Sequence, residues 1–79
     1  MDHKQTVKDL TMILLYLTSW SEKDFYDSQR SRKGYDFDIL NELAEDGLIS
    51  DSKRSKSVVL YEDGINAAKE LLKKYGIEQ

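Results

Sequence analysis

Two short clusters of basic side chains carry the most evident chemistry in this sequence. One cluster is Arg30, Arg32 and Lys33, and the other is Lys53, Arg54 and Lys56. Lysine and arginine bind phosphate oxygens, and arginine also enters the minor groove of a duplex. The clusters therefore predict contact with double-stranded DNA, with these six residues as its binding side chains. The alternative is that both clusters are solvated loops whose charges keep a sheet edge soluble.

The acidic side chains between the two clusters favour a different partner. They are Asp36, Asp38, Glu42, Glu45 and Asp46, and residues 36–46 contain no lysine or arginine. Phosphates repel carboxylates, so a helix with this charge is poorly suited to a DNA groove. A second hypothesis is that this acidic helix, with the rings of Trp20, Tyr26 and Tyr35, receives a basic or apolar protein partner. The other role open to these rings is to cap a small core.

Catalytic, metal-binding and cofactor-binding residues are not expected. The one histidine, His3, lies near the N-terminus, and without cysteines the chain has few activated nucleophiles. Asp38, Glu42 and Glu45 share a helical face that suits a hard cation, but such spacing is more often a solvated face. The four glycines are widely separated and form no phosphate-binding loop. We therefore expect a protein that is not an enzyme and binds no cofactor or metal.

The composition indicates a single small domain over residues 1–79. The chain is 39% hydrophobic and 34% charged, which suits one modest core. Small secreted domains usually need disulfides or zinc, so the absence of cysteine favours the cytoplasm. The longest apolar run, residues 12–17, is too short for a membrane span, and no signal-peptide pattern is present. With a net charge of −3, any DNA contact must use a local patch.

A helix from about residue 3 to 19 is the first element that would position these side chains. Val7, Leu10, Leu14 and Leu17 recur at helical spacing on one face. Further apolar residues between 12 and 16 spread around most of the circumference, so we expect burial on more than one side. Such burial suggests a homodimer through the first and last helices. The alternative is a helix wholly inside the core of one chain.

The segment after this helix is predicted to contain no strand. Ser21 and Asp24 have the spacing of a capping box, which favours a short helix through Phe25 and Tyr26. Residues 28–34 are small, polar and basic, which is typical of a surface loop.

The second half of the chain has clearer signals. A helix is predicted from about residue 36 to 46, with Phe37, Leu40, Leu43 and Ala44 on one face and Gly47 at its end. Leu48–Ser52 and Ser57–Tyr61 are predicted strands of a hairpin with a basic tip. An amphipathic helix follows over about 62–75 and stops before Gly76. The predicted order is helix, short helix, helix, hairpin and helix.

Two segments resemble parts of winged helix-turn-helix regulators. Residues 39–49 resemble the pattern "leucine, two residues, leucine, three residues, Gly-Leu-Ile" that closes their third helix. Residues 58–64 resemble the strand-to-helix junction of the MarR-like and PadR-like groups, with Tyr61 in place of the usual capping threonine. Over its whole length, including residues 33–38, the chain is similar to a small bacterial family known only as a domain of unknown function.

This resemblance implies a fold and, through the regulators, a function. The implied fold is α+β and mainly α: a winged-helix domain with a two-stranded β-hairpin wing and a C-terminal helix. The implied function is DNA binding in the regulation of transcription, with the wing against phosphates. The resemblance names no target sequence, effector or partner protein.

Overall fold

The computed structural model describes residues 3–22, 28–50 and 56–77. The elements in these ranges are α1 (His3–Leu17), β1 (Trp20–Glu22), β2 (Ser28–Arg32), α2 (Phe37–Glu45), β3 (Ile49–Ser50), β4 (Ser57–Leu60) and α3 (Glu62–Lys74). The fold class is α+β and mainly helical, as predicted. The last hairpin and the helix that follows it are confirmed, and the arrangement is compatible with a winged-helix-like domain.

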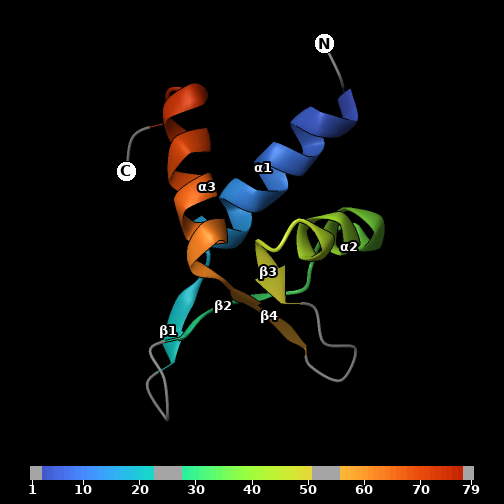
Figure 1. The fold of residues 1–79 in the computed structure, drawn as a ribbon, viewed down its shortest axis with the longest axis vertical. Coiled ribbons are helices and arrows are strands. Elements are labelled where there is room, and N and C mark those ends of the chain that lie inside the picture. The colour runs from blue at the N-terminus through green and yellow to red at the C-terminus, as the bar shows by residue number, and fades with distance from the viewer. Residues whose placement is uncertain (1–2, 23–27, 51–55, 78–79) are drawn as a thin grey trace.

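The strands form one antiparallel sheet in the order β1-β2-β4-β3. The three helices lie together on one side of this sheet (Figure 1). Successive side chains of a strand point to opposite faces. Ser31 of β2 and Val58 of β4 are both fully buried and paired in register, so they lie on the helix side. Arg30 and Arg32 therefore lie on the other face, which the three helices leave uncovered.

The hairpin of β1 and β2 replaces two features that the sequence analysis expected. The short helix from Ser21 is wrong, because residues 20–22 are extended and paired with β2. The surface loop over 28–34 is also wrong, because β2 occupies residues 28–32 inside the sheet and pairs on both edges. Phe25 and Tyr26 lie outside the described residues. The sheet consequently has four strands where the resemblance implied a two-stranded wing.

A buried serine explains why β2 is a strand despite its polar composition. The side chain of Ser31 is 0% exposed, and its hydroxyl lies 3.2 Å from the hydroxyl of Thr18. This small polar side chain fits under the end of α1 with its hydrogen bond satisfied. Backbone pairing to β1 and β4 then holds the strand in place without large apolar residues.

The helix α1 is where it was predicted, but its core-facing side differs. Met12, Ile13 and Leu15 are buried, and Met12 and Leu15 belong to the main core cluster. By contrast, the predicted packing face is exposed: its residues Val7, Leu10, Leu14 and Leu17 have exposed fractions of 37%, 40%, 45% and 43%. The helix is therefore not wholly internal to this chain, and one apolar face points away from the core.

The ends of α2 and α3 agree with the sequence signals. Gly47 follows α2 with φ of +78°, and Gly76 follows α3 with φ of +68°, a left-handed conformation that favours glycine. Tyr61 precedes α3 and makes no side-chain capping bond, as expected for a tyrosine in place of threonine. On α2, however, Phe37 is 63% exposed and Ile39 is buried instead.

The N-cap of α2 gives a first testable prediction. One carboxylate oxygen of Asp36 accepts hydrogen bonds from the backbone N–H groups of Asp38 and Ile39, at 2.9 and 3.2 Å. Asp36→Ala should therefore lower the free energy of unfolding by about 1 kcal/mol in urea titrations. Glu45→Ala, which removes an exposed carboxylate at the other end of α2, is the control and should have little effect. Equal losses in both variants would contradict this role of Asp36.

Candidate functional site

Four of the six predicted DNA-binding residues meet at one end of the sheet. Arg30 and Arg32 belong to β2, Lys33 follows that strand, and Lys56 directly precedes β4. The backbone N–H of Lys33 donates to the carbonyl oxygen of Lys56 at 3.3 Å, so the two sequence clusters lie side by side. Lys53 and Arg54 lie outside the described residues.

A shallow groove joins these cations to an aromatic ring. Its volume is about 480 Å³, and its lining residues are Trp20, Arg32, Lys33, Gly34, Lys56 and Ser57. A second hollow of about 440 Å³ shares Trp20 and Arg32 and adds Thr18 and Tyr35. We call the two hollows together the Trp20 groove. The groove thus combines an aromatic ring with cations, the two kinds of side chain that contact bases and phosphates.

The sheet register places Trp20 on the same face as the arginines. Trp20 pairs directly with Arg30, and cross-strand partners point to the same side of a sheet. The indole is 38% exposed. Arg30 donates from Nε to the hydroxyl of Ser57 at 3.0 Å, which directs its guanidinium across β4. Within the described part of the chain, neither Arg32 nor Lys56 is engaged in an ion pair.

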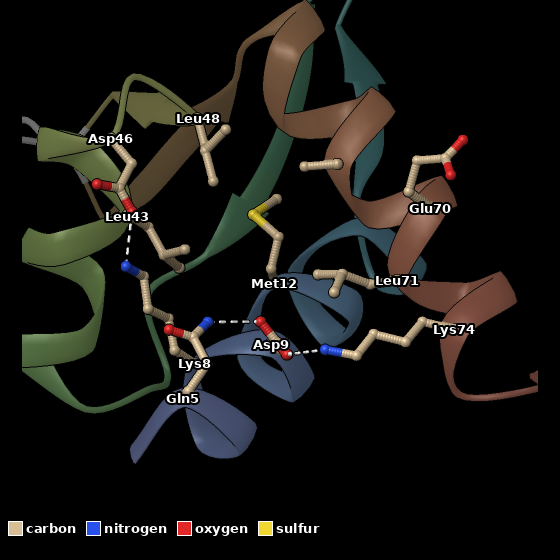
Figure 2. A pocket seen from close by; sticks show the side chains of 11 residues that line it. Gln5, Lys8, Asp9, Met12, Leu43, Asp46, Leu48, Glu70, Leu71 and Lys74 are labelled. Carbon is tan, nitrogen blue, oxygen red and sulfur yellow. Dashed lines mark hydrogen bonds and ion pairs between the residues drawn. The ribbon is translucent and has the colours of Figure 1, made fainter. Parts of the chain in front are cut away.

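The acidic side of α2 is tied to α1. Lys8 Nζ lies 2.6 Å from Asp46 Oδ2 and 3.9 Å from Glu42 Oε1, while Lys4 Nζ lies 3.1 Å from Glu42 Oε2. Figure 2 shows Lys8 reaching Asp46 from α1. These carboxylates therefore serve a contact between helices, which removes part of the surface expected for a basic partner. It also takes Glu42 from the carboxylate face considered for a cation.

The largest hollow, of about 600 Å³, lies between the three helices (Figure 2). Its polar centre is the buried carboxylate of Asp9. Gln5 donates to Asp9 Oδ1 at 2.8 Å, Tyr75 donates its hydroxyl to Oδ2 at 3.0 Å, and Lys74 Nζ lies 3.5 Å from Oδ2. A binding pocket needs polar groups that remain available to its ligand. Asp9 is already occupied, so this hollow is better explained as the polar link between α1 and α3.

The sequence analysis did not connect Trp20 with the basic clusters. Trp20 was assigned with Tyr26 and Tyr35 to a surface beside the acidic helix, but both Trp20 and Tyr35 line hollows that Arg32 also lines. Tyr35 also packs against the core, so it serves in part the capping role that was the alternative. The signal that was available is the alternation in residues 29–32, where arginines alternate with Gln29 and Ser31.

Comparisons with known proteins give a family but no activity. A family model described as a domain of unknown function (DUF6429) matches residues 3–78. This match confirms the resemblance to a family of unknown function, and it shows no winged-helix regulator family. No curated protein matches the chain. No solved structure matches it either. In the described residues, no helix is long and apolar enough to cross a membrane.

Proposed function

Because the chain belongs to the DUF6429 family of domains of unknown function, we propose its function from the Trp20 groove: it binds double-stranded DNA. Arg30, Arg32, Lys33 and Lys56 contact phosphates, and Trp20 packs against the exposed edge of a sugar or base. The supporting observation is that two distant basic clusters meet beside the only tryptophan of a chain whose net charge is −3. A local patch of this kind is what binding by an acidic protein requires.

The position of the groove removes the main electrostatic objection to DNA binding. The acidic helix α2 lies with the other helices on one side of the sheet, whereas Arg30 and Arg32 point to the opposite side. Several DNA-binding proteins place strands rather than a helix against the duplex. A duplex that approaches the sheet face meets cations first, and α2 is not the reading helix in this arrangement. Binding of this kind suits a regulator of transcription.

One observation favours a second candidate, a protein-interaction module that uses α2. Phe37 is 63% exposed, and Asp38 and Glu45 on the same helix are also exposed. An apolar ring beside carboxylates fits a partner with a basic and apolar surface. This surface does not overlap the Trp20 groove, so substitutions separate the two functions.

The experiment that tests the proposal compares two variants with the same change in charge. Arg32→Ala with Lys56→Ala removes two cations of the groove. Lys69→Ala with Lys73→Ala removes two exposed cations of α3 and is the control. Binding to a labelled random-sequence duplex is measured by fluorescence anisotropy at several salt concentrations, with the single strand of the same sequence in parallel.

We expect the wild type and the α3 control to bind with the same salt dependence. The groove variant should bind roughly tenfold more weakly at low salt, and the slope of log K against log salt should fall by about 2, or about 1 for each phosphate contact. Equal losses in both variants would show a general charge effect. Absence of wild-type binding even at low salt would refute the proposal and direct attention to α2.

A further inference from the structure

We propose that two copies of this chain associate through the outer face of α1. This face, which we call the α1 stripe, consists of Val7, Leu10, Leu14 and Leu17. All four side chains are more than one-third exposed, although the opposite side of the same helix is buried in the core. Four aligned apolar side chains form a continuous exposed patch, which is uncommon on a monomer. The proposal is independent of the proposed DNA binding.

The spacing of the α1 stripe selects a second copy as its partner. Its residues are separated by three, four and three positions, which is the a and d pattern of a heptad repeat. Valine then occupies the first a position and leucine the two d positions, a combination typical of two-stranded coiled coils. A seam of this kind is complementary to itself, because the side chains of one copy fit between those of the other.

The charge distribution around the α1 stripe supports the same partner. Residues 10–21 contain no charged side chain, although 34% of the chain is charged. The flanking e and g positions hold Thr6, Thr11, Ile13 and Thr18. Charges at these positions normally choose a different partner or repel an identical one. Their absence permits two identical helices to approach, and it offers nothing that would attract a charged foreign helix.

The size of the seam sets the strength of the association. The α1 stripe spans only two heptads, and the outer face of α3 is polar, with Asn66, Lys69 and Lys73 exposed. The last helix therefore adds no apolar surface to the interface, and the pairing rests on α1. A small interface of this kind gives a weak dimer, with a Kd on the order of micromolar.

Sedimentation equilibrium over a range of protein concentrations tests this inference. The average mass of the wild type should rise from monomer toward dimer. Leu14→Glu places a charge in the middle of the seam and should raise the Kd by about 100-fold. Phe37→Glu changes another exposed apolar residue, outside the stripe, and should leave the Kd unchanged. A wild type that stays monomeric, or equal weakening by Phe37→Glu, would overturn the proposal.

Disulfide trapping provides a second readout with folded, uncharged variants. The chain has no cysteine, so Leu10→Cys and Leu14→Cys each introduce a single thiol. A disulfide forms only when two Cα atoms come within about 7 Å. We expect a 14-to-14 disulfide if the helices pair in parallel, or a 10-to-14 disulfide in a mixture if they are antiparallel. If neither forms faster than dimers of Phe37→Cys, the seam does not exist.

Discussion

Replacement of Gly64 by alanine is expected to lower the free energy of unfolding by about 3 kcal/mol, enough to unfold much of so small a domain. A Cβ atom at this position would lie 2.0 Å from the carbonyl oxygen of Leu48 and 2.9 Å from its carbonyl carbon. Both atoms belong to the backbone, so no side-chain rotation relieves the clash. The same carbonyl accepts a hydrogen bond from the N–H of Tyr61 at 3.0 Å, so a shift of Leu48 also disturbs the start of α3.

The sign of this effect makes the Gly64 prediction easy to test. Glycine to alanine inside a helix normally stabilises by about 1 kcal/mol, and here we expect a larger effect in the opposite direction. Urea unfolding followed by circular dichroism gives the measurement. Gly34→Ala is the control, because nothing lies within 4 Å of a Cβ there and the backbone is not left-handed. Similar stability in the two variants would mean that α3 does not pack this closely on Leu48.

The two adjacent leucines of α1 should respond very differently to truncation. Leu15 is 0% exposed and lies in the core cluster, whereas Leu14 is 45% exposed. Leu15→Ala should cost about 2–5 kcal/mol, because it removes buried surface and leaves a cavity. Leu14→Ala should change the free energy of unfolding of the monomer by less than about 0.5 kcal/mol.

This comparison must be made where the monomer predominates. Urea unfolding at low protein concentration satisfies that condition, since any association through the α1 stripe is then lost. Comparable costs for the two variants, or a larger cost at Leu14, would show that the packing face of α1 is the one its apolar periodicity first indicated. In that case the stripe would not be available to a second copy.

The long elements were predictable because their local signals agree with their packing. The helices α2 and α3 have a strong apolar periodicity, and glycines in a left-handed conformation follow each of them. The hairpin of β3 and β4 follows from two short apolar runs on either side of a basic turn. For α1, periodicity gave the limits of the helix but not its orientation, because apolar residues surround most of its circumference.

The first hairpin was not predictable from local signals. Strand β2 is polar and basic, like a loop, and its stability comes from pairing with strands on both sides. One of these, β4, lies almost thirty residues away in the sequence, as the pairing of Arg30 with Val59 shows. The basic residues of the candidate site were therefore identified by type, whereas their meeting with Trp20 depends on sheet order, which the sequence did not reveal.

The fluorescence of Trp20 tests most directly whether the Trp20 groove contacts DNA. This residue is the only tryptophan in the chain, and its indole lines both hollows of the groove. During titration with a short duplex at low salt, we predict a saturable change in its emission that added salt reverses and that the Arg32→Ala, Lys56→Ala variant lacks. A labelled duplex that binds the protein while the emission of Trp20 stays constant would place the contact elsewhere and contradict this site.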